Sequence, residues 1–340
     1  MNMNNTLPVT FTTGCAIEKD YIYIVAKLDS LHQEDKFARI YIFDDQKNHD
    51  KWVHHDLADW EVVSVCIRKA TTTSPRMVCA LSENGELELR FVDGAIIEKI
   101  PGAGLADSNS SGYGYVNAIR EIGNHLYVCG LSGQVYRRSD DGWSHFDHGL
   151  LQSMDATEKA VEQLKLGNSK LMQDVIEDTF SLRDINGLTE TDIYTVGDEG
   201  RIFHHDGNRW TELTPPNNEN LIRVKCISEN EVWICGDNGT LLKGNWRDGF
   251  KDVSSVGNND IFLSVEKFND LIYISTENEL FIYDNEKILP LETNLKPELQ
   301  DAHLLEAKDG VLWSFGYKDL AYFDGKTWTR VDHPDNSPIR

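Results

Sequence analysis

The segment Ile193-Tyr-Thr-Val-Gly197 recurs along this 340-residue chain with its apolar and aromatic character retained. The related segments are Leu126-Tyr-Val-Cys-Gly130, Val232-Trp-Ile-Cys-Gly236, Leu271-Ile-Tyr-Ile-Ser-Thr276 and Val311-Leu-Trp-Ser-Phe-Gly316. The last residues of four of these copies, Gly197, Gly236, Thr276 and Gly316, follow one another at intervals of 39, 40 and 40 residues. A period of about 40 residues is typical of the blades of a β-propeller. The repeat therefore predicts the fold, whereas function has to be inferred from other features.

Each repeat contains four short strands, called a to d here, separated by turn-forming residues. In the clearest copy the strands are expected at 180–187, 191–197, 201–205 and 208–213, with Asp198-Glu-Gly200 and Asp206-Gly207 as the b–c and c–d turns. Equivalent blades are expected at 9–58, 61–101, 115–149, 220–255, 260–293 and 301–333. We predict one all-β domain, 1–340, folded as a seven-bladed β-propeller of four-stranded antiparallel blades.

One interruption of the repeat is helical in character. Gly130 and Gly197 are 67 residues apart, which is 27 more than the 40-residue period allows. The stretch from Ser153 to Leu164 begins with capping residues and early acids and then places apolar residues on one helical face. Gly167-Asn168 ends this pattern, and a second helical pattern occupies 169–178. We predict a short α-helical insertion at 153–179, between the third and fourth blades.

The chain is strongly acidic. It has 56 Asp and Glu residues against 33 Lys and Arg residues, giving a formal net charge of -23. Nucleic acids and anionic membranes bind basic surfaces, so both are excluded as expected partners. A basic protein fits this charge, although acidity can also serve solubility alone.

The composition also bears on location. The N-terminus lacks a basic start followed by an apolar run, and no stretch approaches the roughly 20 apolar residues of a membrane span. The six cysteines are expected to be small buried hydrophobic residues rather than disulfides or metal ligands. We therefore expect a soluble cytoplasmic protein that is a monomer on its own.

The c–d turns carry a family resemblance. They read Asp206-Gly-Asn-Arg-Trp210 and Asp324-Gly-Lys-Thr-Trp328, with a shortened Asp141-Gly-Trp143. These turns resemble the Asp-box of BNR-type propellers, and the whole repeat resembles bacterial WD40/YVTN-like and photosystem-assembly-factor-like propeller proteins. His204 and Tyr322 stand where the Asp-box has Ser or Thr. The resemblance implies the fold and a structural role for the turn, and it implies no active residue.

No catalytic or metal-binding constellation emerges from the residues. The Arg-Ile-Pro segment of sialidase-type propellers is absent, and nothing singles out one pair of the many carboxylates as a glycosidase pair. The pairs His54-His55 and His204-His205 point to opposite faces of a strand and are expected to be surface or edge histidines. Cofactor motifs such as the phosphate loop are absent as well. We predict no catalytic, cofactor-binding or metal-binding residues.

Propeller topology places the irregular segments on one face of the ring. The b–c turns and the d-to-a crossings emerge at the same end of an antiparallel blade, so the long loops 27–37 and 102–114 should lie beside the helical insertion. Binding residues concentrate on long loops of rigid scaffolds. The candidate partner-binding residues on this face are Glu34, Asp35, Glu83, Asp107, Glu158, Glu162, Asp198, Glu199, Asp237, Glu277 and Glu279. The alternatives are that these acids only form turns and that the helices only plug the channel or cover a blade edge.

These features together predict a non-catalytic protein-binding propeller whose acidic face binds a basic protein partner. One concrete form is an inhibitor or immunity protein that neutralises a cationic bacterial toxin or effector domain. Two alternatives stay open: a propeller hydrolase or lyase acting on a glycan or lactone, and an assembly factor or scaffold for a larger complex.

Overall fold

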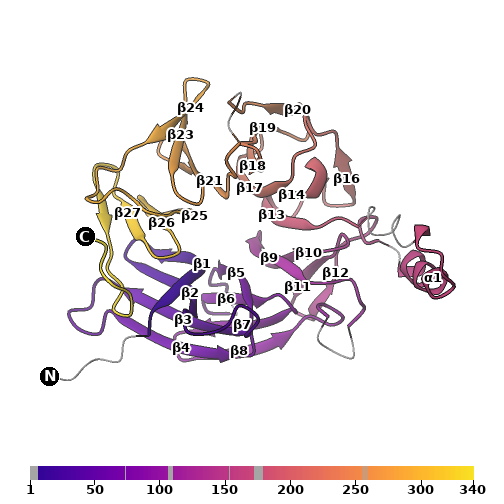
Figure 1. The fold of residues 1–340 in the computed structure, drawn as a ribbon, viewed down its shortest axis with the longest axis horizontal. Helices are drawn as coiled ribbons and strands as arrows, with labels where there is room; N and C mark the ends of the chain where they lie inside the picture. Colours follow the sequence, from indigo (N-terminus) through magenta and orange to yellow (C-terminus); the bar gives the residue numbers. More distant parts are fainter. Residues whose placement is uncertain are drawn as a thin grey trace.

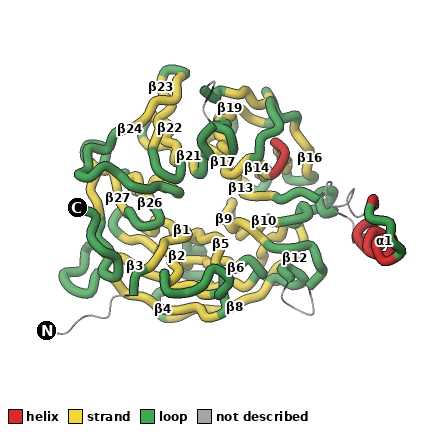
Figure 2. Tube along the Cα trace, in the orientation of Figure 1, coloured by secondary structure: helices red, strands yellow, loops and turns green. Residues whose placement is uncertain are grey.

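The computed structural model describes residues 7–72, 74–105, 110–152, 154–171, 179–255, 257 and 259–340, and it forms a ring of seven sheets around a central axis (Figure 1). Each sheet contains four antiparallel strands paired in chain order, so the prediction of seven four-stranded antiparallel blades is confirmed. Figure 2 shows that strands dominate the ring and that loops connect them at both ends.

The blades follow one another along the chain. Blades 1 and 2 contain β1 (Val9–Glu18), β2 (Tyr21–Leu28), β3 (Phe37–Asp44), β4 (Trp52–Ala58), β5 (Val62–Arg68), β6 (Met77–Ser82), β7 (Glu86–Phe91) and β8 (Gly94–Lys99). Blades 3 and 4 contain β9 (Val116–Ile122), β10 (His125–Gly130), β11 (Val135–Ser139), β12 (Gly142–His145), β13 (Leu182–Thr189), β14 (Asp192–Gly197), β15 (Ile202–His205) and β16 (Trp210–Leu213). Blades 5 and 6 contain β17 (Leu221–Ser228), β18 (Glu231–Gly236), β19 (Leu241–Asn245), β20 (Gly249–Asp252), β21 (Ser264–Phe268), β22 (Leu271–Ser275), β23 (Leu280–Asp284) and β24 (Lys287–Leu291). Blade 7 contains β25 (Leu304–Lys308), β26 (Val311–Phe315), β27 (Leu320–Phe323) and β28 (Trp328–Arg330).

The first strand of every blade lies innermost. Contacts between blades run from β1 to β5, β9, β13, β17, β21 and β25 in turn, and β25 contacts β1 to complete the ring. The second strand of each blade is enclosed on both faces, and all six residues of β14 are buried. This position explains why the recurring segment is almost continuously apolar.

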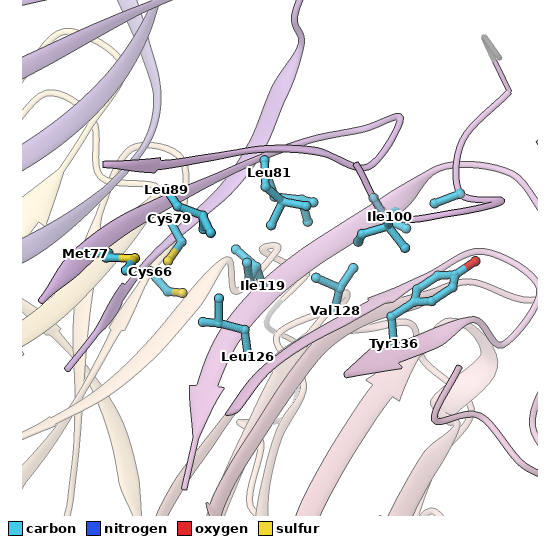
Figure 3. Packing of buried hydrophobic residues seen from close by; sticks show 13 residues of the cluster. Cys66, Met77, Cys79, Leu81, Leu89, Ile100, Ile119, Leu126, Val128 and Tyr136 are labelled. Carbon is cyan, nitrogen blue, oxygen red and sulfur yellow. The ribbon is translucent and has the colours of Figure 1, made fainter. Parts of the chain in front are cut away.

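The hydrophobic core lies between blades. One cluster joins Leu81 and Leu89 of blade 2 to Ile119 and Val128 of blade 3 (Figure 3). Other clusters join blades in the same way, including one that joins Phe11 of blade 1 to Trp313 of blade 7. Because each blade buries its apolar faces only against its neighbours, the blades depend on ring closure for stability.

The glycine that ends the recurring segment has a packing role. A Cβ atom at Gly197 would collide with the backbone oxygen of Ser181, and one at Gly236 would collide with that of Asn220. In both blades the colliding residue lies just before the innermost strand. The chain therefore enters the inner strand so close to the end of the second strand that a side chain does not fit.

The segment after the last strand crosses from blade 7 to blade 1. His333 is buried, and its ring lies 4.3 Å from the ring of Tyr41, 4.6 Å from that of Trp52 and 5.2 Å from that of Phe11. Blades 1 and 7 share no strand. The C-terminal segment thus supplies part of the contact that closes the ring.

One α-helix lies wholly within the described residues, and Lys170 and Leu171 are helical as well. Helix α1 (Met154–Lys165) follows β12 and projects from the rim of the ring (Figures 1 and 2). The predicted helix end is found: Asn168 N donates to Gln163 O at 2.9 Å, Gly167 N donates to Leu164 O at 2.9 Å, and Gly167 has a positive φ of 87°. Most of the second predicted helix, from 172 to 178, lies outside the described residues. Within the described residues, no helix has the length and apolar character needed to cross a membrane.

Candidate functional site

Long loops of blades 1 to 3 meet on one face of the ring. The Lys36 ammonium, from the b–c loop of blade 1, forms an ion pair with Glu83 in the b–c turn of blade 2 and lies 5.6 Å from the centre of the Tyr115 ring. In the crossing from blade 2 to blade 3, Leu105 N donates to Asn84 Oδ1 at 3.1 Å. The b–c elements and this d-to-a crossing are therefore in direct contact.

The ends of the helical insertion are fixed to the same face. Ser132, in the b–c turn of blade 3, donates its backbone N–H to Phe180 O at 2.9 Å and accepts a bond from Gln152 N at 2.9 Å. Gln152 and Phe180 flank the insertion on its two sides. The surface formed by the b–c turns, the d-to-a crossings and the base of the insertion is called the elaborated face below.

Three of the predicted acids on this face are only partly exposed and have internal partners. Glu83 is paired with Lys36. The Asp198 carboxylate lies 2.6 Å from Arg183 Nε and accepts a 3.0 Å bond from Ser181 N. Asp237 accepts a 2.9 Å bond from the Asn220 amide. These three residues hold turns and crossings in place, so they are less available to a partner than the sequence suggested.

Other predicted acids are exposed to solvent. The exposed side chains are those of Glu34, Asp35, Glu162, Glu199, Glu277 and Glu279. Glu199 lies in the b–c turn of blade 4 with a positive φ of 57°, and its carboxylate is 3.7 Å from Arg201 Nη2. Asp107 lies outside the described residues, as does the side chain of Glu158. The acids brought to one face are thus a mixture of turn-forming and free groups.

The central channel is a second feature, which sequence reasoning missed. It encloses a cavity of about 350 Å³ that is lined by residues of all seven inner strands. Charged residues at its wall are Lys69, Arg120, Glu121, Asp184, Arg223, Lys225, Glu266, Glu306 and Lys308. The sequence did contain an indication of a polar channel. In several repeats, charged and polar residues occupy alternate positions of strand a, where apolar residues would be expected.

Many of these polar residues cap the inner strand of the next blade. Ser64 Oγ accepts a 3.2 Å bond from Ile119 N, and Asp184 Oδ2 accepts a 3.1 Å bond from Val224 N. Glu306 Oε2 accepts a 2.8 Å bond from Ala16 N across the seam of the ring. An inner strand has no further strand to pair with, so side chains of the preceding blade satisfy its buried amides.

The channel charges are mostly matched in pairs. Arg120 Nη2 lies 2.7 Å from Asp184 Oδ1, and Lys225 Nζ lies 2.6 Å from Glu266 Oε2. Burial raises the pKa of Glu306 from 4.5 to about 7, against the lowering effects of the bond from Ala16 N and of Lys225. Burial lowers the pKa of Arg223; the negative charge of Asp184 opposes this effect, and the positive charge of Arg120 adds to it.

The predicted exposure of one histidine pair is wrong. His204 and His205 are buried, although the sequence suggested surface or edge positions. The His204 ring stacks on Trp246 with centroids 4.9 Å apart, and its Nε2 lies 2.9 Å from Asp192 Oδ1. Across the described residues there is no group of three or more His, Cys, Asp or Glu side chains arranged to hold a metal ion.

The c–d turns have the structural role that the resemblance implied. Asp206 Oδ1 accepts bonds from the backbone N–H groups of Asn208 and Arg209 at 2.9 and 3.0 Å. Asp324 Oδ1 likewise accepts bonds from the backbone N–H groups of Lys326 and Thr327, at 2.8 Å each. These bonds lower the pKa of both aspartates.

One curated relative resembles this chain along nearly its whole length. Immune protein Tsi7 from Pseudomonas aeruginosa is 26% identical over 325 residues, which cover 94% of this chain and 96% of that protein. No family model matches the chain. The Asp-box resemblance therefore stays an interpretation of the c–d turns.

Solved structures of similar fold include propellers with different roles. The structure titled YCF48 bound to D1 peptide matches with a TM-score of 0.59 at 12% identity, covering 95% of this chain and 93% of that one. The WD40 domain of Doa1 matches with a TM-score of 0.58 at 8% identity, covering 93% and 96%. Virginiamycin B lyase from Staphylococcus aureus matches with a TM-score of 0.57 at 12% identity, covering 81% and 85%. These likenesses support the WD40-like and photosystem-assembly-factor-like resemblance at the level of the fold alone.

Proposed function

We propose that this protein is an immunity protein that binds a toxin and neutralises it. The similarity to an immune protein, which extends over nearly the full length of both chains, carries the proposal. A match of this extent covers the inner strands, the turns and the crossings together, so it concerns the whole propeller and not one repeat.

The elaborated face is the proposed docking surface. Loops from blades 1, 2 and 3 contact one another there, and the insertion that bears α1 starts and ends there. Exposed carboxylates at Glu34, Glu199, Glu277 and Glu279 add negative charge to b–c elements of three blades. A rigid ring that presents such loops resembles other scaffolds whose binding residues lie on loops.

The proposed partner is a basic toxin or effector domain that meets the protein in the cytoplasm. A chain of net charge -23 attracts a cationic protein over long range and disfavours docking of acidic proteins. In this proposal the propeller acts as a monomer and as a non-catalytic binder.

Two other roles use the same scaffold. A lyase or hydrolase needs a group free to act on a substrate, but Asp184 and Glu266 of the channel are each matched by a cation. The lyase neighbour shares the fold alone. An assembly factor would use the elaborated face as an immunity protein does, so the two differ in the identity of the partner.

The experiment is capture followed by rescue. Tagged protein is used to capture partners from its native host at low salt, and the captured protein is identified by mass spectrometry. We expect a basic protein that arrests growth when produced alone in a heterologous bacterium and loses this toxicity when the propeller is produced with it. Capture of a non-toxic subunit of a larger complex would favour the assembly role instead.

Matched charge reversals test the surface. The triple variant Glu34→Lys, Glu277→Lys and Glu279→Lys alters the elaborated face. The control Asp93→Lys, Asp270→Lys and Glu286→Lys changes net charge equally at exposed residues of a–b and c–d turns. We expect the first variant to weaken toxin binding at least about tenfold and to reduce its salt dependence, with a much smaller effect of the control. Equal effects of the two variants would show that the elaborated face is not the docking surface.

A further inference from the structure

Arg223 stands out among the charged residues of the channel because it shares its nearest carboxylate with a second arginine. Its Nη1 lies 3.9 Å from Asp184 Oδ1, whereas Arg120 Nη2 lies 2.7 Å from the same oxygen. Its Nε is buried and has no hydrogen-bond acceptor among the described residues. A guanidinium group presents a planar fork of donors that suits a carboxylate or phosphate, and a buried donor without an acceptor is costly. Arg223 is therefore positioned to bind an anion.

The cavity wall as a whole, Arg223 included, has five Lys and Arg residues against four Asp and Glu residues. Arg120 and Lys225 are matched by Asp184 and Glu266, and Lys308 forms no ion pair within the described part of the chain. Glu306 is the remaining acid near this set, and burial raises its pKa to about 7, so a fraction of it is neutral near pH 7. The cavity thus has a small positive excess, whereas the protein as a whole is strongly acidic.

Two residues with neutral hydrogen-bond donors line the same cavity as Arg223. Asn186 Oδ1 accepts a 3.3 Å bond from Cys226 N, which leaves the Asn186 NH₂ group able to donate. Ser264 Oγ accepts a 3.1 Å bond from Leu305 N, which leaves its hydroxyl hydrogen able to donate. Both residues line the cavity with Arg223. An oxyanion has several acceptor oxygens and no need for a donor, so these groups suit it.

The size of the cavity limits the ligand. A volume of about 350 Å³ lies near the lower end of the range for small-molecule sites, about 300–1,000 Å³. Inorganic phosphate or a small di- or tricarboxylate would fit, whereas a folded segment of another protein would not.

We propose that the central channel binds a small oxyanion, phosphate or a compact polycarboxylate, through the guanidinium of Arg223 with Asn186 and Ser264 as supporting groups. This site goes beyond the proposed toxin binding and does not depend on it. Binding of the oxyanion joins inner strands β13, β17 and β21, so it stabilises the closed ring.

The test is a titration of the full chain with inorganic phosphate and, separately, with citrate. Calorimetry and thermal unfolding are followed at constant ionic strength, maintained with chloride. We expect saturable binding of at least one probe, with a rise in the midpoint of unfolding. Arg223→Gln should weaken binding of the probe at least about tenfold. Arg223→Lys keeps the positive charge but lacks the planar guanidinium, so its affinity should lie between those of the natural protein and Arg223→Gln. Arg209→Gln, at an exposed turn, is the matched control.

Two further readouts separate a site from a general salt effect. Asp184 keeps its close pairing with Arg120 in the Arg223→Gln variant, so in chloride alone this variant should unfold at the same temperature as the natural protein or higher. Glu306→Gln should bind the probe more tightly than the natural protein at pH 8, with little difference at pH 5, where Glu306 is protonated. Absence of saturable binding for both probes, or equal affinities of the natural protein and Arg223→Gln, would overturn the proposal.

Discussion

The hydroxyl of Tyr41 donates a 2.7 Å hydrogen bond to Asp335 Oδ2, although the two residues are 294 positions apart in the chain. Tyr41 belongs to the third strand of blade 1, and Asp335 lies beyond the last strand of blade 7. Asn336 adds a second link, because its Oδ1 accepts a 2.9 Å bond from Val9 N. The short C-terminal segment therefore fastens the two ends of the ring without adding a strand.

Removal of the buried ring at the seam should destabilise the whole propeller. His333→Ala deletes a side chain packed among three aromatic rings, and we expect a loss of about 2–4 kcal/mol in the free energy of unfolding, measured with urea. His148→Ala, at an exposed histidine, should change it by less than about 0.5 kcal/mol. A small effect of His333→Ala would mean that the seam closes without this segment.

The same residue should make the protein sensitive to acid. Burial lowers the pKa of His333 from 6.5 to about 4, with smaller opposing and assisting effects of Asp335 and His54. A depressed pKa in the folded state means that this contribution is complete above pH 6.5 and is lost as pH falls toward 4. The difference corresponds to roughly 3 kcal/mol. His333→Phe should therefore give a flatter plot of unfolding free energy against pH between 6.5 and 4; an unchanged slope would contradict the assignment.

Glu306 should produce a pH dependence of the opposite sign. Its pKa rises from 4.5 to about 7 in the folded protein, so its contribution is complete below pH 4.5 and is lost as pH increases through 7. The groups that face it are Lys225, Glu266 and Arg120. Glu306→Gln should gain up to roughly 3 kcal/mol relative to the natural protein between pH 4.5 and 8. Glu292→Gln, at an exposed position, should show no such gain.

The glycine of the recurring segment should not tolerate a methyl group. Gly197→Ala places a Cβ against the backbone oxygen of Ser181, and we expect a loss of about 2–4 kcal/mol in unfolding free energy. At Gly94 the nearest atom to an added Cβ is 3.5 Å away, on the ring of Phe91, so Gly94→Ala should change stability by less than about 0.5 kcal/mol. Comparable losses in the two variants would show that space at the strand end is not the reason for the glycine.

The sequence predicted those features that depend on short stretches of chain. Strand periodicity and turn residues such as Asp198-Glu-Gly200 recur every 40 residues, so the number and bounds of the blades could be read directly. The break that follows α1, at Gly167, was also predicted from neighbouring residues alone. The Asp184 carboxylate instead caps Val224, 40 residues later, and meets Arg120 from the preceding blade. Such contacts follow from how neighbouring blades face one another, which the repeat pattern does not contain.

The candidate site was predictable to a smaller degree. Strand topology predicts that Glu83, in the b–c turn of blade 2, lies on the same face as the b–c loop of blade 1. The ion pair between Glu83 and Lys36 depends in addition on the conformation of that long loop, which the sequence pattern does not contain. Exposure of Glu277 and Glu279 is expected for residues in a tight turn. Burial of His204 depends on Trp246 of the next blade and on Asp192, so its own strand carried no sign of it.

The caps between inner strands give the repeats a fixed order. Ser64 caps the inner strand of blade 3, Asp184 that of blade 5 and Glu306 that of blade 1, so these three repeats carry different groups, each suited to the blade that follows. Duplication or deletion of one repeat would keep the 40-residue period but place a cap beside the wrong recipient. Divergence among the seven repeats thus makes their number and sequence hard to change, and hybrid propellers built from related chains should exchange neighbouring repeats together.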